Sequence, residues 1–233
     1  MNNVQNEQLL KEKKTHAPIL WGLFWLLVLL LVDQLTKTLA DVYFIDMVGG
    51  GDPLKGLTSR VVIIPGMLEL CISYNRGIAF SMFSDAGTTA KMAIVLGTGV
   101  VMLILAIVYC KIYRRRTWVR CALILIVAGG LGNLIDRAYY QVWDPATDAL
   151  IRDGVRDMVY LNVVMDFGAC NFADFFICIG AVVLILSLIF FDQDAIFPLG
   201  KYKTLSKEAE AREEVKKAAK QAKKQAKYEQ NNG

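Results

Sequence analysis

The chain has 233 residues, of which 55% are hydrophobic, and its 26 lysine and arginine residues against 22 aspartate and glutamate residues give a net charge of +4. The apolar residues are concentrated in long runs, which excludes an ordinary soluble domain. The sequence has one histidine and no CxxC, CxxH or HExxH pattern, so we expect no metal and no cofactor.

Four apolar runs are long enough to cross a bilayer as helices. With their polar ends, the expected spans lie at about 17–37, 89–110, 117–137 and 172–191. The first run is followed by DQLTK and has no small-residue cleavage site. We therefore interpret it as a retained span and not as a secretory signal.

Cations indicate the orientation of these spans. They precede the first span and follow the second and the fourth: Lys11, Lys13, Lys14, Lys111, Arg114, Arg115, Arg116 and a lysine-rich tail. The two long connections, 41–88 and 138–171, carry few cations. The positive-inside rule then places both termini in the cytoplasm and both long loops outside. Since His16 lies on the cytoplasmic side, a histidine-dependent catalytic site on the outer face is excluded.

The first span ends in DQLTK, where Asp33 and Lys37 are four residues apart. On a helix they share a face and can form an ion pair. The alternative is a snorkelling pair that only marks the outer interface.

The outer loops contain strand-like segments. In the first loop, VVII and LELCISY carry β-branched and aromatic residues at strand lengths, which predicts a small extracytoplasmic sheet. In the second loop, VRDMVYLNVVM is a candidate for a further strand. Cys71 and Cys170 lie in these loops, and whether they form a disulfide stays open.

The third span ends in GGLGNLIDR. Its glycines allow another backbone to approach closely, as helix packing in lipid favours. Asn133 and Arg137 are four residues apart and share a helix face, and Asp136 is the neighbour of Arg137. The alternative to a functional cluster is a set of interhelical hydrogen bonds.

The fourth span opens with CNFAD, where Asn171 and Asp174 are three residues apart. The simplest interpretation is an N-cap followed by an acid on the helix dipole. However, several carboxylates converge at this membrane face. Two carboxylates about 5 Å apart, at an effective dielectric constant of about 20, repel by about 3 kcal/mol. Such a pair keeps one proton at neutral pH, so one member can activate water while the other donates to a carbonyl oxygen.

Four motifs occur in a characteristic order: DQLTK (33–37), NRGIAF (75–80), GGLGNLIDR (129–137) and NFAD (171–174). With them, residues 17–191 resemble the lipoprotein signal peptidases, also called signal peptidase II. The resemblance implies an α-helical integral membrane protein with four transmembrane helices and a small extracytoplasmic β-sheet cradle. Residues 1–191 would form this peptidase domain. Residues 192–233 would form a basic, Ala/Lys/Glu-rich cytoplasmic tail, which is expected to be helical.

The resemblance implies a membrane aspartyl endopeptidase. It would remove the signal peptide from diacylglyceryl-modified prolipoproteins, before the lipidated cysteine, at the outer face of the bacterial inner membrane. Its partners would be these substrates and membrane lipid, with no nucleic acid, and it would act as a monomer without a cofactor. The alternative function is a four-span transporter or scaffold that uses the aspartates as a proton relay or packing cluster.

The family's two catalytic aspartates are carried over as follows. The N-x-A-D motif assigns Asp174. The V-V-D-F motif has two candidates, because VVMDF contains Asp166 whereas GVRDM contains Asp157. Asp166 precedes Asp174 by only eight residues, about half the usual spacing, so we select Asp157 and keep Asp166 as the competitor. In this register Arg156 stands where Val is usual.

The resemblance also implies supporting residues around the pair. Asn75 would bind substrate backbone, and Asn133, Arg137 and Asn171 would orient the substrate and the aspartates. The full supporting set is Asp33, Lys37, Asn75, Gly77, Asn133, Asp136, Arg137 and Asn171.

Overall fold

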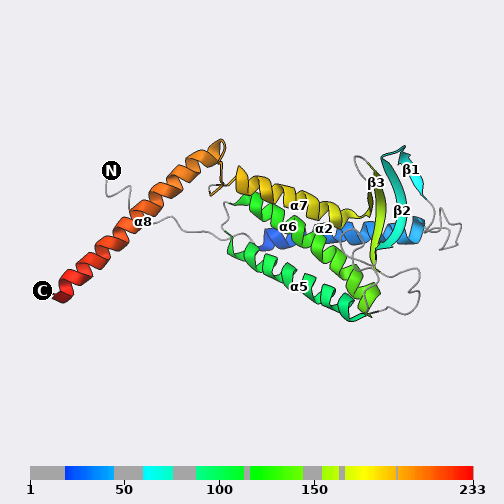
Figure 1. Ribbon diagram of the computed structural model, residues 1–233, viewed down its shortest axis with the longest axis horizontal. Coiled ribbons are helices and arrows are strands. Elements are labelled where there is room, and N and C mark those ends of the chain that lie inside the picture. The colour runs from blue at the N-terminus through cyan, green and yellow to red at the C-terminus, as the bar shows by residue number, and fades with distance from the viewer. Residues whose placement is uncertain are drawn as a thin grey trace.

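The computed structural model describes residues 19–44, 60–75, 88–112, 116–143, 154–162, 166–192 and 194–232. Four helices in these ranges are long and apolar enough to cross a membrane. They are α2 (Ile19–Leu39), α5 (Thr88–Lys111), α6 (Thr117–Arg137) and α7 (Phe172–Ile189), and they run side by side as a bundle (Figure 1). The four predicted spans are confirmed.

Helix α6 is the centre of the bundle. It packs against α2, α5 and α7. In the most apolar 18-residue stretch of each helix, 61% of the residues are buried in α6, compared with 11% in α2, 11% in α5 and 22% in α7. These outer helices expose large apolar side chains such as Phe24, Leu96 and Ile179. Because lipid solvates such side chains, the exposed surface fits a membrane setting.

Two glycines of α6 allow the close packing that the sequence predicts. A Cβ atom at Gly129 would overlap the carbonyl oxygen of Ala173 in α7, and one at Gly132 would overlap the carboxylate of Asp33 in α2. Since neither atom can be accommodated, these glycines bring the polar ends of α2, α6 and α7 together.

The first and third spans continue beyond their expected ends. A π-helical segment, η1 (Ala40–Phe44), extends α2, and a second one, η3 (Ala138–Trp143), extends α6. Asp41 in η1 is buried and accepts a hydrogen bond from the Tyr74 hydroxyl. The predicted spans ended at 37 and 137, where the polar motifs DQLTK and GGLGNLIDR end. Both π-helical segments contact the sheet, η1 through the hydrogen bond of Asp41 and η3 through the Tyr140 ring, which lies against that of Tyr74 on β2.

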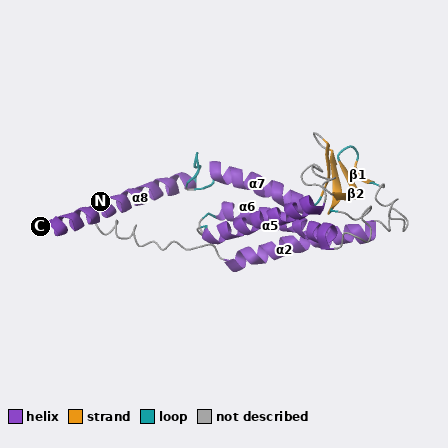
Figure 2. Cartoon of the chain, turned by 60° about the horizontal axis from the view of Figure 1, so that its bottom comes forward, coloured by secondary structure: helices purple, strands orange, loops and turns teal. Residues whose placement is uncertain are grey.

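A four-stranded antiparallel sheet lies at one end of the bundle (Figure 2). Its order is β1 (Val61–Ile64), β2 (Leu68–Asn75), β3 (Val155–Asn162) and β4 (Asp166–Cys170). Strands β1 and β2 are the two segments predicted in the first loop, and their turn contains Gly66 with a φ of 72°. The candidate segment of the second loop forms β3, so the predicted sheet is confirmed, whereas β4 was not predicted.

The cysteines form no disulfide. All five are free thiols, including Cys71 on β2 and Cys170 on β4. Both strands are neighbours of β3 on opposite sides, so they are about 9.5 Å apart, which is two strand spacings. This separation exceeds the Cα distance that a disulfide allows.

The tail is helical, as predicted. The chain folds back after α7, with hydrogen bonds from Phe197 N to Ile189 O at 2.8 Å and from Ile196 N to Leu188 O at 3.1 Å. Helix α8 (Lys201–Asn232) then extends away from the bundle, and within the described ranges it packs along no other helix or strand (Figure 1).

Because α8 adds so few contacts, its removal is expected to leave the bundle intact. A chain that ends after Ser206 keeps Tyr202, whose ring meets that of Phe191. We expect its thermal unfolding midpoint in detergent to stay within about 2 °C of the full chain. The comparison variant is Asp192→Asn, which removes the buried partner of Arg116 at 2.6 Å and should lower the midpoint clearly. A larger drop for the truncated chain than for Asp192→Asn would contradict this prediction.

Candidate functional site

A cluster of buried polar side chains lies where α2, α6 and α7 meet strand β3. Asp33, Lys37, Asp136 and Asn171 have no exposed surface, and Asp157 is 2% exposed. Burial of so many charges is unfavourable unless each is paired and hydrogen-bonded. The partners of each group therefore define the site.

Lys37 connects two helices through its ammonium group. Its Nζ atom lies 2.9 Å from Asp33 Oδ2 on the same helix and 3.5 Å from Asp136 Oδ2 on α6. It also donates to Asn133 Oδ1 at 3.0 Å. The pair of Asp33 and Lys37 is therefore part of the buried cluster and does not snorkel toward an interface.

The first turn of α7 is held by two side chains from other helices. Asp33 Oδ1 accepts the backbone N–H of Ala173 at 3.0 Å, which ties α2 to α7. Asn133 Nδ2 donates to Asp174 Oδ1 at 2.8 Å, which ties α6 to α7. Because Lys37 occupies the oxygen of Asn133, the amide nitrogen of Asn133 faces Asp174.

Asn171 and Asp174 form a capping box at the start of α7, as the simplest interpretation of CNFAD predicted. The backbone N–H of Asp174 donates to Asn171 Oδ1 at 3.2 Å, and that of Asn171 donates to Asp174 Oδ2 at 3.0 Å. The cap is also a bridge, because Asn171 Nδ2 donates to Asp157 Oδ1 at 2.6 Å. One asparagine thus contacts both candidate aspartates.

Asp157 and Asp174 differ in their surroundings. Burial, and next the negative charge of Asp174, raise the pKa of Asp157 to about 7, against smaller opposing effects from Asn171, Lys37 and Asn75. Asp174 instead lies at the N-terminus of α7, where it accepts one N–H group from the Asn133 side chain and one from the Asn171 backbone. Asp157 is therefore suited to hold a proton near neutral pH, next to a second carboxylate.

Asp166 lies at the opposite end of the β3–β4 hairpin from Asp157. It pairs with Asn162, five residues along β3 from Asp157. At about 3.3 Å per residue the backbone positions of these two aspartates are roughly 16 Å apart. The strand register therefore separates Asp166 from the cluster.

Other predicted site residues lie in or near the cluster. Asn75 on β2 hydrogen-bonds Asp157, and Arg137 lies within electrostatic range of Asp174, Asp157 and Asp136. Gly77 lies outside the described residues.

Sequence reasoning missed two members of the cluster. Gln34 Nε2 donates to Asp33 Oδ2 at 3.0 Å and to Gly132 O at 3.1 Å, although in the sequence it resembles any polar residue at a helix end. Arg156 Nη2 lies 2.8 Å from Asp136 Oδ1. The sequence did carry one sign of Arg156, since a cation stands directly before Asp157 where the family pattern usually has Val.

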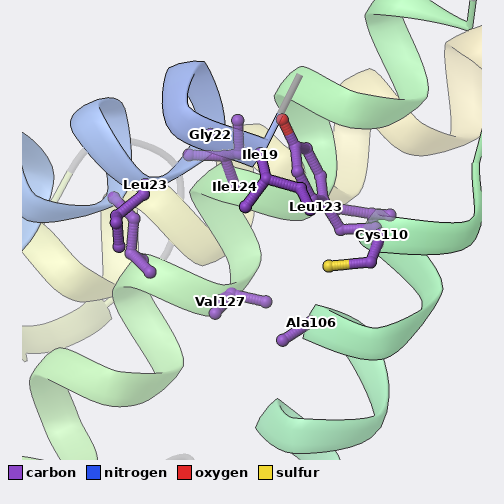
Figure 3. A pocket seen from close by; sticks show the side chains of 10 residues that line it. Ile19, Gly22, Leu23, Ala106, Cys110, Leu123, Ile124 and Val127 are labelled. Atoms are coloured by element: carbon purple, nitrogen blue, oxygen red, sulfur yellow. The ribbon is translucent and has the colours of Figure 1, made fainter. Parts of the chain in front are cut away.

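An apolar cavity of about 140 Å³ lies between α2, α5 and α6, away from the polar cluster, and Figure 3 shows side chains that line it. Its lining includes Leu23, Tyr109 and Leu123. It holds no carboxylate or cation. In the part of the chain that the structure describes, no three histidine, cysteine or acidic side chains converge to hold a metal ion. Among the described residues, the polar cluster is therefore the candidate for the protein's chemistry.

The raised pKa of Asp157 predicts a pH-dependent stability. Its folded pKa of about 7 exceeds the ordinary value of 3.8, so the folded state binds more protons than the unfolded state between about pH 4 and 7. The free energy of unfolding should then fall as the pH rises through this window. The Asp157→Asn variant lacks this effect. Its free energy of unfolding should equal that of wild type near pH 4 and exceed it by up to about 4 kcal/mol at pH 8.

Unfolding in detergent between pH 4 and 8 measures this difference. Asp194→Asn is the control, because it makes the same substitution at a side chain that is 56% exposed. A constant difference between wild type and Asp157→Asn across the range would contradict the prediction.

Comparisons with known proteins point to one family. The family model described as signal peptidase (SPase) II matches residues 25–190. A lipoprotein signal peptidase of Fusobacterium nucleatum is 28% identical over 172 residues, which cover 73% of this chain and 87% of the relative. One from Pseudomonas fluorescens is 31% identical over 169 residues, which cover 72% and 86%. A solved bacterial membrane enzyme shares the fold, with a TM-score of 0.56 at 21% identity over 76% of this chain and 98% of that chain.

Proposed function

The chain belongs to the signal peptidase II family, and we propose that it removes signal peptides from prolipoproteins by an aspartic-peptidase mechanism with Asp157 and Asp174 as the catalytic pair. One observation carries the choice of residues. The two carboxylates are bridged by Asn171, and the pKa of Asp157 is raised to about 7, so that it can keep a proton near neutral pH.

The proposed first step divides acid and base work between the two aspartates. Asp174, as the ionised member, accepts a proton from a water molecule whose oxygen attacks the scissile carbonyl carbon. Asp157 gives its proton to the carbonyl oxygen. The products of this step are a neutral gem-diol, a protonated Asp174 and an ionised Asp157, so charge and protons balance.

The second step breaks the peptide bond. The proton on Asp174 moves to the leaving nitrogen as the C–N bond cleaves, and one gem-diol hydroxyl returns its proton to Asp157. The new carboxyl and amino termini leave, and the pair is restored without any cofactor. Arg137, within electrostatic range of both aspartates, would limit the repulsion between them during this exchange.

The proposed substrate is a prolipoprotein whose cysteine already carries diacylglycerol, cut just before that cysteine. The site is at the end of the spans, and the neighbouring outer helices are apolar toward lipid. The acyl chains of a bound substrate could therefore remain in the bilayer while the peptide reaches the aspartates. With the orientation from the positive-inside rule, the site faces outward and both termini are cytoplasmic. The enzyme would act as a monomer, with residues 1–191 as the peptidase unit.

A cleavage assay tests this proposal. The detergent-solubilised protein is incubated with a diacylglyceryl-modified prolipoprotein and, separately, with the same prolipoprotein lacking the lipid. The expected product is a lipidated protein whose first residue is the modified cysteine, identified by mass spectrometry, with little product from the unmodified substrate. No cleavage would contradict the proposed function, and equal cleavage of both substrates would contradict the lipid requirement.

A further inference from the structure

We propose that Arg156 is the positioning residue for Asp157, because it fixes strand β3 to the carboxylate of Asp136 on α6. This inference rests on the proposed function, since it concerns the geometry of the catalytic pair.

Asp136 binds both the backbone and the side chain of Arg156. Its Oδ2 atom accepts the Arg156 backbone N–H at 3.0 Å and the Nε–H at 3.3 Å, and its Oδ1 atom accepts from Nη2 at 2.8 Å. Arg156 is 6% exposed and Asp136 is fully buried. One carboxylate therefore holds both the Val155–Arg156 peptide unit and the side chain of the residue directly before Asp157.

The rest of the guanidinium group is also occupied. Nη2 donates to Gln34 Oε1 at 3.1 Å and Nη1 donates to Thr38 Oγ1 at 3.3 Å, both on α2. The carbon atom of the guanidinium lies 5.3 Å from the centre of the Tyr140 ring on η3. Strand β3 is therefore held against two helices by one side chain.

This anchor places both aspartates relative to α6. Asn133 and Asp136 are three residues apart on α6, so they share a helix face. Asn133 holds Asp174 at 2.8 Å, and Asp136 holds Arg156, whose neighbour is Asp157. Since successive strand residues point to opposite faces, an Arg156 directed at α2 and α6 leaves Asp157 on the other face of β3, where Asn171 at the start of α7 binds it.

Lysine cannot reproduce these contacts, because only the planar guanidinium supplies several donors in a fixed fork. Arg156→Lys keeps the charge and loses this geometry. We expect it to lower kcat by about tenfold to a hundredfold, since small displacements of reacting groups have effects of this size, while KM changes by less than about threefold.

The same sheet offers a matched control. Arg60 also pairs with an acid, Glu69 at 3.2 Å, and lies over a tyrosine ring, Tyr160 at 4.0 Å, but its side chain is 49% exposed and lies on the β1 side of the sheet. Arg60→Lys should leave kcat within about twofold of wild type. A wild-type kcat in folded Arg156→Lys, or equal losses in both variants, would overturn the proposal.

A milder variant covers the case in which Arg156→Lys does not fold. Thr38→Val removes one of the guanidinium's acceptors and replaces an exposed side chain. It should lower kcat by about threefold with KM unchanged. An unchanged kcat in this variant would overturn the proposal.

A second measurement needs no peptidase activity. If Arg156 holds Asp157 in its buried place, then Asp157→Asn should raise the unfolding midpoint at pH 8 when it is made in the wild-type protein. The same change made in the Arg156→Lys protein should raise the midpoint by at most half as much. Equal gains in both backgrounds would overturn the positioning role. Since this coupling is read from unfolding alone, a failure of the proposed peptidase function can be distinguished from a failure of the inference.

Discussion

Asp157→Asn and Asp174→Asn are each expected to reduce the rate of prolipoprotein cleavage by at least about a thousandfold. An amide cannot accept the proton of the attacking water and cannot give a carboxyl proton to the scissile carbonyl, so each change removes one half of the acid–base exchange. The two amides have nearly the shape of the original side chains, and the capping oxygen of Asp174 is retained in the asparagine. The rate is measured in detergent from the loss of the lipidated precursor.

Asp166→Asn is the control for this experiment. Its backbone lies at the far end of the β3–β4 hairpin, so the variant should cleave the precursor at close to the wild-type rate. All three variants should show the helical content and the detergent elution volume of wild type. An inactive Asp166→Asn beside an active Asp157→Asn would show that the first catalytic aspartate was assigned incorrectly. Full activity of both Asp157→Asn and Asp174→Asn would contradict the aspartic mechanism.

Lys37→Met is expected to lower the free energy of unfolding by about 3–5 kcal/mol. The ammonium group has no exposed surface and lies within 3.5 Å of the carboxylates of Asp33 and Asp136. Its removal leaves two buried acids without their shared cation and leaves the oxygen of Asn133 without a donor. The loss is measured by thermal or denaturant unfolding of the detergent-solubilised protein.

The tail supplies a matched comparison for Lys37. Lys217 and Glu213 form a pair with the same four-residue spacing at 3.0 Å, but their side chains are 72% and 67% exposed. Lys217→Met should therefore change stability by less than about 0.5 kcal/mol. Similar losses for the two variants would show that burial does not decide the strength of these pairs and would refute the prediction for Lys37.

The expected effects of Asp157→Asn on activity and on stability have opposite signs. The same burial that keeps a proton on Asp157 makes its ionised form unfavourable, so the folded protein loses stability at high pH. An asparagine would relieve this cost and abolish the proposed chemistry. Such a trade-off is common where a site depends on a destabilised group.

The sequence by itself determined the four spans, the strands β1, β2 and β3, the tail helix and the family. Each of these depends on a pattern within one segment: a long apolar run, β-branched residues at strand length, an Ala/Lys/Glu-rich stretch or an ordered set of short motifs. The cap at Asn171 and Asp174 was also readable, because its two hydrogen bonds join residues three positions apart.

Only the tertiary structure decided which side chains meet. Arg156 contacts Gln34 across 122 residues and Asp136 across 20, and no local pattern encodes either pairing. The register of β3 and β4 separates Asp166 from Asp157, and the position of β3 between β2 and β4 keeps Cys71 and Cys170 apart. The physical reason is that a buried charge has to find its partner on another segment, so its position depends on how the helices and the sheet pack together.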